Sequence, residues 1–529
     1  MSFVSHSAPD RSNFWKQGEL VEVTITDLSD GGDGVGRVDD RVVFVPDTVT
    51  GDRVSVRLLR VKPQYAHGKV ENLLEASPHR VRPSCIVADK CGGCQWQHVT
   101  YEYQLEAKRN QVLQALQRIG GFSDVKVDPM LAIGSALHYR NKSTYPVGIA
   151  ERQSGHSSTK PSSNQPISKP SPSSSKPSSS KPIIKPSIQR NAQPSSQDDS
   201  ATELKTSSQS IVHGRVIAGY YQKGSHQIVN LNQCPIQDER LNPILEAVKQ
   251  DIGKQKWPIY DETTHQGNIR HIGLRVGRRT GDLLLTIVAK DRKITDLWQQ
   301  AEAWMQRFGL VGVCLNLNPG KTNAIFGPQT FCIVGQGYLE ETFADLTLQI
   351  RPDTFFQVYT EQAEALLQTI QQELKLQGQE TIVDAYCGIG TLSLPLAKQV
   401  KQVIGIESQA AAIEQAKINA ASNNIHNAEF HIGAVETVLP TLEIQPDIVL
   451  LDPPRKGCER SILEILRQWH PHNIVYVSCN PATLARDLKI LCSDGLYALQ
   501  RVQPADFFPQ TPHVETAVFL VRSDCTQET

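Results

Sequence analysis

Short apolar runs alternate with helix-like stretches from about residue 346 onward, and this alternation constrains the fold more than any other feature. The runs are TIVDAYCGIG, KQVIGIE, AEFHIG, PDIVLLDPP and NIVYVSCN, and helix-like stretches such as AAAIEQAKINAASNN follow them. Repeated strand–helix–strand units predict a parallel, doubly wound α/β sheet with helices on both faces. Ligands bind such sheets beyond the carboxyl ends of the strands, so we expect a functional site at that edge.

The first run ends in a glycine turn that is typical of nucleoside-binding sites. Gly388 and Gly390 let the backbone approach a ligand closely, although many strand-to-helix turns contain glycine for their geometry alone. Glu407 ends the next strand, 17 residues after Gly390, at about the distance where a carboxylate receives two ribose hydroxyls. Ser393 stands where a dinucleotide motif would place a third glycine. Because S-adenosylmethionine has no pyrophosphate, it fits this pattern better than NAD.

Later runs place reactive side chains at the same edge. Asp452 precedes two prolines and is expected to orient a substrate or cofactor, unless it serves only a rigid turn; Arg455 after it is a candidate phosphate contact. Cys479 ends a strand just before a helix, whose dipole is expected to lower the thiol pKa and supply a thiolate nucleophile. A buried, unreactive cysteine is the alternative. Glu515, close to His513, is a candidate general base.

Four cysteines form a candidate metal site. Five and two intervening residues separate Cys85, Cys91 and Cys94, and Cys234 in NQCPI is the fourth thiol. Such a set can hold zinc, because four thiolates complete a tetrahedral shell. The total of 11 cysteines is odd and the cluster is tight, so reduced thiols are expected rather than a disulfide framework.

Valine-rich runs separated by Gly and Asp turns fill residues 17–75 and predict a small closed β-barrel. Some small barrels bind oligonucleotides and others are only structural. The candidate RNA contacts in this barrel are Arg57, Arg60, Lys62, Tyr65, His67 and Lys69. A formal net charge of -1 excludes long-range attraction of a polyanion by the whole protein, so local patches would have to bind RNA.

Residues 154–210 differ in composition, with 20 serines and 8 prolines among 57 residues and no aromatic side chain. Such a segment cannot bury enough apolar surface to offset its chain entropy, so the sequence predicts a disordered insertion. The flanking stretches HYRNKSTYPVGI and IVHGRVIAGYY have the pattern of strands. We therefore expect the insertion to interrupt a hairpin inside one domain.

These motifs resemble the RNA (uracil-5-)-methyltransferase family, in particular its enzymes acting on 23S ribosomal RNA. The resemblance runs nearly end to end, through the barrel and the stretches CIVADKCGGCQWQH, YRNKSTYPV, GNIRHIGLR, RPDTFFQV, DAYCGIG, LDPPRKG, VSCNPATLARDL and HVETAVFL. It implies a multidomain α/β protein with three parts. These are an OB-like TRAM β-barrel at 14–77, a central α+β domain with a four-cysteine cluster at 78–345, and a Rossmann-like class I methyltransferase domain at 346–525.

The resemblance also assigns a role to each candidate residue. Cys479 would add to carbon 6 of uracil, and Glu515 would remove the proton from carbon 5, so that methylation proceeds through a covalent adduct. The family positions that contact S-adenosylmethionine are Gln357, Tyr386, Glu407 and Asp452. A [4Fe–4S] cluster, with zinc as the alternative, would be held by Cys85, Cys91, Cys94 and Cys234.

Several residues are candidate contacts for the RNA, and the chain differs from the family pattern at two places. The target uridine must leave its stacked helix, and Phe355 or Phe356 is the candidate stacking residue, with a core position as the alternative. Phosphate contacts are predicted at Arg270, Arg275, Arg278 and Arg279, unless these form a solvated strand face. Tyr359 stands where relatives often have Asn, and Ala434 and Val435 replace an acidic residue expected beside the adenine.

The sequence therefore predicts S-adenosylmethionine-dependent methylation of carbon 5 of a uridine, with 23S ribosomal RNA as the expected substrate. The alternatives are a uracil-5 methyltransferase acting on transfer RNA and a non-catalytic RNA-binding protein with the same fold. The chain contains no run of about 18 apolar residues and no signal-like start, so a cytoplasmic protein without membrane contact is expected. We also expect a monomer.

Overall fold

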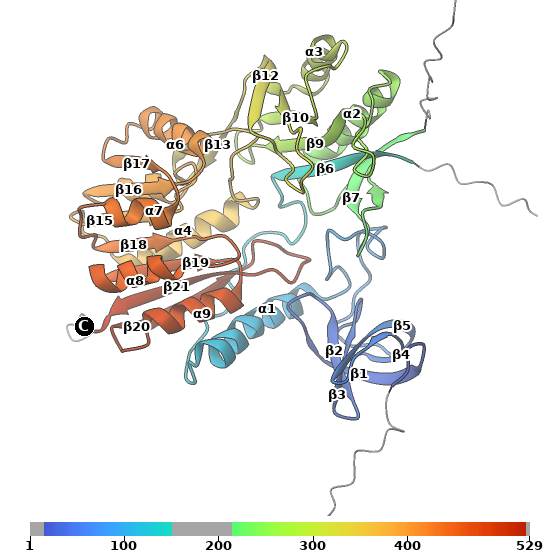
Figure 1. The fold of residues 1–529 in the computed structure, drawn as a ribbon, viewed down its shortest axis with the longest axis horizontal. Coiled ribbons are helices and arrows are strands. Elements are labelled where there is room, and N and C mark those ends of the chain that lie inside the picture. The colour runs from blue at the N-terminus through green and yellow to red at the C-terminus, as the bar shows by residue number, and fades with distance from the viewer. Residues whose placement is uncertain (1–14, 151–213, 525–529) are drawn as a thin grey trace, which may run out of the picture. The chain divides into compact units, whose positions relative to one another are not determined.

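The computed structural model describes residues 15–150 and 214–524, which form a barrel, two seven-stranded sheets and a separate hairpin (Figure 1). The predicted disordered insertion at 154–210 lies outside these residues. Within the described ranges, no helix has the length and apolar character needed to span a bilayer.

The N-terminal strands close into a five-stranded barrel in the order β1-β2-β3-β5-β4, which confirms the prediction of a closed barrel. The strands are β1 (Leu20–Leu28), β2 (Gly34–Val38), β3 (Arg41–Val45), β4 (Arg53–Val61) and β5 (Tyr65–Glu75). Alternate residues such as Val54, Val56 and Leu58 fill the apolar interior. Gly36 is required where β1 and β2 meet, because a Cβ there would lie 2.5 Å from the carbonyl oxygen of Thr24.

The central sheet has the order β12-β11-β10-β9-β6-β7-β8. Its strands are β6 (Lys142–Ile149), β7 (Val216–Tyr221), β8 (Ile228–Asn230), β9 (Ile269–Val276), β10 (Leu283–Ala289), β11 (Gly312–Leu317) and β12 (Gln329–Gly335). Two helices, α2 (Asn242–Lys254) and α3 (Leu297–Phe308), cover one face. Val248 of α2 and Trp304 of α3 share an apolar core with Ile272 and Leu274 of β9.

Strands β6 and β7 are antiparallel neighbours, with Ile149 opposite Val216. The backbone N–H of Ala150 also donates to the carbonyl oxygen of Arg215 at 2.9 Å. The described chain therefore leaves and re-enters the same hairpin around the predicted insertion, which confirms the prediction that the insertion interrupts a hairpin.

The C-terminal sheet has the order β17-β16-β15-β18-β19-β21-β20. Its strands are β15 (Thr381–Ala385), β16 (Gln402–Glu407), β17 (Ala428–Ile432), β18 (Ile448–Leu451), β19 (Asn473–Ser478), β20 (Tyr497–Ala505) and β21 (Glu515–Arg522). The first five in this order are parallel, as predicted, whereas β21 runs antiparallel to both β19 and β20. The last two strands therefore form an antiparallel pair joined by residues 506–514, and no helix crosses over between them.

Helices lie on both faces of this sheet because its strands are apolar on both sides (Figure 1). One face packs against α4 (Thr360–Leu374), α5 (Ser393–Ala397) and α6 (Ala410–Ser422), and the hairpin of β13 (Leu339–Phe343) and β14 (Leu346–Ile350) joins the same core. The other face packs against α7 (Val435–Val438), α8 (Arg460–Trp469) and α9 (Pro481–Leu491).

Residues 101–131 pack on the C-terminal sheet although the sequence interpretation places them in the central domain. Helix α1 (Tyr101–Ala115) contributes Val112 to the core formed with α8 and α9. The backbone N–H of Leu131 donates to the carbonyl oxygen of Pro504 at 2.8 Å. The predicted boundaries at 14–77, 78–345 and 346–525 stay predictions.

One buried ion pair fixes α1 to the segment that follows β20. The ammonium of Lys108 lies 2.6 Å from a carboxylate oxygen of Asp506, and both side chains are completely buried. The same ammonium donates to the carbonyl oxygen of Phe508 at 3.1 Å. Burial lowers the pKa of Lys108 while the Asp506 carboxylate opposes that shift, so each charge depends on the other for its stability.

Replacing Lys108 by Met should leave the Asp506 carboxylate buried without its cation. We expect the free energy of unfolding to fall by about 3 to 5 kcal/mol, measured by urea denaturation followed by circular dichroism. The control is Lys489→Met, which removes an exposed lysine of α9 and should change the free energy by less than about 0.5 kcal/mol. Equal, small effects of the two substitutions would contradict this account of the ion pair.

Candidate active site

The turn after β15 brings backbone and side chains to the carboxyl edge of the parallel sheet. Gly388 and Gly390 adopt positive φ angles of 55° and 87°, a conformation that favours glycine. Tyr386 also has a positive φ, 132°, which is strained for a residue with a side chain. The N–H groups of Tyr386 and Cys387 both donate to the carbonyl oxygen of Ile406 at 3.0 Å, which ties the turn to β16.

Three of the four residues predicted to contact the cofactor line one cavity at this edge. Gln357, Tyr386 and Asp452 surround it together with Phe355 and Asp384. The segment carrying Gln357 is held in place by Asn141, whose side-chain amide donates to the carbonyl oxygen of Gln357 at 2.8 Å. The sequence pattern did not assign Asp384 a role, although its place at the start of DAYCGIG was a usable signal.

Glu407, the fourth predicted cofactor contact, does not line that cavity. It ends β16, directly beside β15, and its carboxylate accepts from the N–H of Gln409 at 2.8 Å and from the hydroxyl of Ser408 at 2.9 Å. Its charge helps to raise the pKa of Asp384, so the two carboxyl groups are electrostatic neighbours. Glu407 therefore lies at the edge of the site. The backbone N–H of Gln409, the residue before helix α6, orients its carboxylate.

Burial dominates the electrostatics of the carboxyl groups. It raises the pKa of Asp384 to about 6, although the hydroxyl of Ser393 donates to this carboxylate at 2.5 Å and opposes the shift. Burial, followed by repulsion from Asp384, raises the pKa of Asp452 to about 7. Both groups therefore hold protons at a pH where exposed aspartates are ionised.

Cys479 and Glu515 meet at the ends of two paired strands. Ser478 of β19 lies opposite Thr516 of β21, and the next residue pair outward in this antiparallel register is Cys479 and Glu515. Cys479 is partly exposed and opens into a cavity of about 500 Å³. Asn480 caps α9 behind it, accepting from the N–H of Ala482 at 3.0 Å. The structure thus brings the predicted nucleophile and base together.

The expected lowering of the Cys479 pKa by the helix dipole is wrong. Burial, with repulsion from Glu515 and Asp452, raises the pKa of Cys479 to about 11. Desolvation and two carboxyl groups outweigh a helix terminus, whose partial charge is only about half an elementary charge. The pKa of Glu515 is also raised well above its usual value, first by burial and then by Asp452.

Arg455 supplies positive charge to this group of acids. Its charge lowers the pKa of both Cys479 and Glu515, against the larger effect of burial. One guanidinium nitrogen of Arg455 lies 3.3 Å from Nδ1 of His513, whose pKa falls to about 4 through burial and this positive neighbour. Arg455, predicted as a phosphate contact, therefore faces the thiol and the acid directly, and His513 stays neutral.

The two adjacent phenylalanines have different surroundings. Phe356 is 1% exposed and packs edge-on against Phe343 in the core. Phe355 is 63% exposed and lines the cofactor cavity. Of the two alternatives for this pair, Phe356 takes the core position and Phe355 is the side chain available for stacking.

The predicted phosphate contacts at Arg270 and Arg275 are wrong because both side chains are buried, whereas those at Arg278 and Arg279 stay predictions. Arg270 is buried and donates to the carbonyl oxygens of Asn318 and Gly320, each at 2.6 Å. Arg275 is buried and donates to the carbonyl oxygen of Thr354 at 3.2 Å. The guanidinium groups of the remaining pair are taken up by acids: Arg278 pairs with Asp238 and Glu361, and Arg279 pairs with Glu364.

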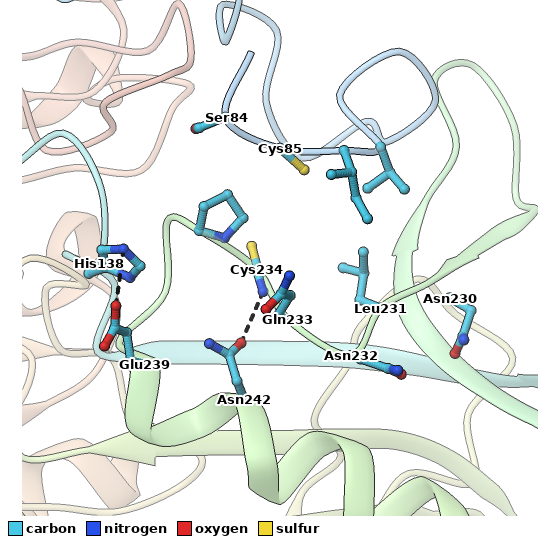
Figure 2. A pocket seen from close by; sticks show the side chains of 13 residues that line it. Ser84, Cys85, His138, Asn230, Leu231, Asn232, Gln233, Cys234, Glu239 and Asn242 are labelled. Atoms are coloured by element: carbon cyan, nitrogen blue, oxygen red, sulfur yellow. Dashed lines mark hydrogen bonds and ion pairs between the residues drawn. The ribbon is translucent and has the colours of Figure 1, made fainter.

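The four predicted ligand cysteines line one small cavity. It lies between the segment holding Cys85, Cys91 and Cys94 and the loop holding Cys234. Figure 2 shows the sulfur atoms of Cys85 and Cys234 directed into the space between their loops. Burial raises the pKa of Cys94 to about 12 and that of Cys234 to about 11. Among residues 15–150 and 214–524, no three His, Cys, Asp or Glu side chains lie close enough together to bind one metal ion.

The segment after these cysteines supports the loop that carries His513 and Glu515. The backbone N–H of Trp96 donates to the carbonyl oxygen of Gln510 at 3.0 Å, and its indole N–H donates to Gly32 of the barrel at 3.0 Å. Gln104 of α1 exchanges two hydrogen bonds with Gln510, at 2.9 and 3.1 Å. Neither Trp96 nor Gln104 was found by sequence reasoning, because a polar contact between residues 406 positions apart leaves no local pattern.

Comparison with known proteins agrees with this arrangement. The sequence model of the tRNA (uracil-5-)-methyltransferase family matches residues 219–523, and that of the TRAM domain matches residues 15–70. The chain belongs to the tRNA (uracil-5-)-methyltransferase family. The predicted family and the TRAM barrel are thereby confirmed, and S-adenosylmethionine as cofactor and RNA as substrate are supported for this family member.

Named relatives cover almost the whole chain. An uncharacterized RNA methyltransferase of Nostoc sp. is 59% identical over 510 residues, covering 96% of this chain and 98% of the relative. One from Synechocystis sp. is 48% identical over 511 residues, covering 96% and 97%. The solved Pyrococcus abyssi tRNA (uracil-54, C5)-methyltransferase, in complex with S-adenosyl-L-homocysteine, is 25% identical with a TM-score of 0.66, covering 95% of this chain and 100% of that chain.

The raised Cys479 pKa gives a prediction that can be tested without substrate. We expect its alkylation by iodoacetamide, followed by mass spectrometry of the Cys479 peptide, to titrate with a midpoint near pH 11. Glu515→Gln removes a negative neighbour and should move the midpoint to lower pH. Arg455→Gln removes a positive neighbour and should move it to higher pH. A wild-type midpoint below about 8.5, the ordinary thiol value, would contradict the account.

Proposed function

We propose that this protein methylates carbon 5 of a uridine in RNA, with Cys479 as the nucleophile and Glu515 as the base. The observation that carries the proposal is the meeting of these two side chains at the ends of β19 and β21. They adjoin Asp452, which also lines the cavity holding Gln357 and Tyr386. A thiol, a buried acid and a cavity lined by the predicted cofactor residues, all at one sheet edge, are the parts that uracil-5 methylation requires.

The proposed reaction uses Cys479 to make carbon 5 nucleophilic. The sulfur of Cys479 forms a bond to carbon 6 of the uracil, and the electron pair of the carbon 5–carbon 6 double bond becomes available at carbon 5. S-adenosylmethionine supplies a sulfonium-bound methyl group for transfer to carbon 5. Glu515 then takes the proton from carbon 5, the double bond re-forms, and the bond from carbon 6 to Cys479 breaks.

The raised pKa values have a use in this sequence of steps. A carboxyl group with a raised pKa is a stronger base once ionised than an ordinary glutamate, which suits Glu515 to removing a carbon-bound proton. Cys479 must lose its own proton before it attacks, and Arg455 is the cation beside it that favours the thiolate. Arg455 therefore serves in thiol activation as well as in any phosphate contact.

The predicted cofactor residues have distinct proposed tasks. Glu407, at the end of β16, receives the ribose hydroxyls, while Gln357, Tyr386 and Asp452 surround the part of the cofactor nearest the methyl group. The positive φ of Tyr386 places its side chain at the cavity wall. In place of Asn, Tyr359 buries its ring and donates its hydroxyl to the carbonyl oxygen of Ile133 at 2.5 Å, so this departure serves packing.

We further propose that Cys85, Cys91, Cys94 and Cys234 hold a [4Fe–4S] cluster. Four thiols around one small cavity are a suitable donor set for the four iron corners. A single tetrahedral zinc ion would need its sulfur ligands about 3.8 Å apart, and zinc remains the alternative. When bound, the cluster would cross-link the segment before Trp96 to the loop around Cys234. This cross-link would hold Trp96 in position for its hydrogen bond to Gln510.

For the RNA substrate we propose 23S ribosomal RNA, on the combination of TRAM barrel and four-cysteine set. Transfer RNA is the second candidate, because the Pyrococcus abyssi enzyme that this chain covers completely acts on uracil 54 of tRNA. The monomeric state and the cytoplasmic location are likewise proposals.

Mass spectrometry of nucleosides from separated ribosomal and transfer RNA tests both the chemistry and the substrate. Deletion of the gene should remove 5-methyluridine from one site of 23S ribosomal RNA, and the wild-type gene should restore it. Genes encoding Cys479→Ala or Glu515→Gln should not restore it, whereas Cys492→Ala, at a cysteine outside both cavities, should. Loss of 5-methyluridine from transfer RNA alone would favour the second candidate, and unchanged methyluridine in both fractions would contradict the proposed function.

A further inference from the structure

A cavity of about 730 Å³ contains none of the residues assigned to methyl transfer (Figure 2). Its walls are the segment 84–87, the loop 230–235 and the start of α2 with His138 beside it. It shares Cys85 and Cys234 with the cysteine cavity, so it lies directly outside the proposed cluster. Its volume falls in the range of small-ligand sites, about 300 to 1,000 Å³.

Carboxamide groups form the polar side of this cavity, and several are fixed by neighbours. The side-chain oxygen of Asn242 accepts from the N–H of Cys234 at 2.9 Å and from Gln237 at 2.6 Å (Figure 2). The ammonium of Lys249 donates to the side-chain oxygen of Asn232 at 2.6 Å, which directs the Asn232 NH₂ away from it. Gln233 is exposed, with no side-chain hydrogen bond among the described residues. Hydrogen-bond donors and acceptors are therefore available at this wall.

The rest of the lining is largely apolar. It includes Val87, Leu231, Pro235 and Ile86, and the last is 88% exposed. Among the described residues that line the cavity there is no Lys or Arg, and the Glu239 carboxylate lies 3.4 Å from the His138 ring.

These features fit a flat, uncharged ligand with hydrogen-bonding edges. A phosphate would need a cation in the lining, whereas a nucleobase needs an apolar face to stack on and amide groups to pair with its edge. Cations stand outside the cavity on the same segment: Arg82 and Lys90 are both exposed there. These two cations, on the segment that carries Ile86, are available to the backbone phosphates of an RNA bound there.

We propose that this cavity binds an unpaired nucleobase of the RNA substrate, at a distance from the uridine that is methylated. This proposal rests on the proposed function, because it takes RNA as the substrate. It gives the cysteine-rich segment a direct part in RNA recognition: Ile86 and Gln233, the neighbours of Cys85 and Cys234, contact the base.

The test compares two double variants of the full-length protein. Ile86→Ala with Gln233→Ala removes the stacking face and one amide, and Ile418→Ala with Gln399→Ala removes an exposed isoleucine and an exposed glutamine elsewhere. The probes are in vitro transcripts of 23S ribosomal RNA and of transfer RNA from the source organism. We expect the first variant to raise the RNA dissociation constant at least about fivefold, without a change in kcat, in melting temperature or in iron and zinc content. The control should bind as the wild type does.

Photo-crosslinking with transcripts containing 4-thiouridine supplies an independent readout, and we expect crosslinked peptides from 84–90 or 230–235. Wild-type affinity of the first double variant, or crosslinks confined to other segments, would overturn the proposal and leave the cavity to a protein partner. Methyl transfer measured on the same transcripts separates the two claims. Crosslinks in the cavity without methyl transfer support this site and overturn the proposed function, whereas methyl transfer without RNA contact here overturns this site alone.

Discussion

Burial of carboxyl groups at the carboxyl edge of one parallel sheet is the constraint on which the rest of the site depends. Asp384 and Asp452 have pKa values of about 6 and 7, and the pKa of Glu515 is raised further from its usual value. Burial of the thiol itself, and then repulsion from Glu515 and Asp452, raises the pKa of Cys479 to about 11. A positive charge at this edge favours the ionised forms of these groups. Arg455 supplies one such charge, and the sulfonium of S-adenosylmethionine would supply another.

The loop between β20 and β21 carries part of this edge, and residues from the N-terminal part of the chain hold it. The fully buried pair of Lys108 and Asp506 anchors its beginning, and Gln104 and Trp96 bind Gln510 further on. Buried polar groups of this kind are costly unless fully paired, so they favour one position of the loop over all others. The position of Glu515 is thereby coupled to the segment that follows the cysteines.

The sequence predicted the barrel, the strand–helix order, the hairpin around the insertion and the meeting of Cys479 with Glu515, because these follow from periodicity and from motifs at strand ends. It could not predict which way adjacent side chains face, which separates exposed Phe355 from buried Phe356. It also missed properties that depend on distant packing. The expected low pKa of Cys479 was wrong because local sequence shows a helix start but not desolvation. The burial of Arg270 could not be predicted because the carbonyl groups that accept its hydrogen bonds lie some 50 residues away in the sequence.

The central claim is that the thiol of Cys479 bonds to the uracil during methyl transfer. RNA containing 5-fluorouridine tests it most directly, since the fluorine at carbon 5 cannot leave as a proton does and the adduct persists. Incubation of the wild type with this RNA and S-adenosylmethionine should give a covalent complex whose mass equals protein, RNA and one methyl group, with peptide mapping to Cys479, and Cys479→Ala should give none. Methyl transfer to unmodified RNA by a wild type that forms no such complex would contradict the account.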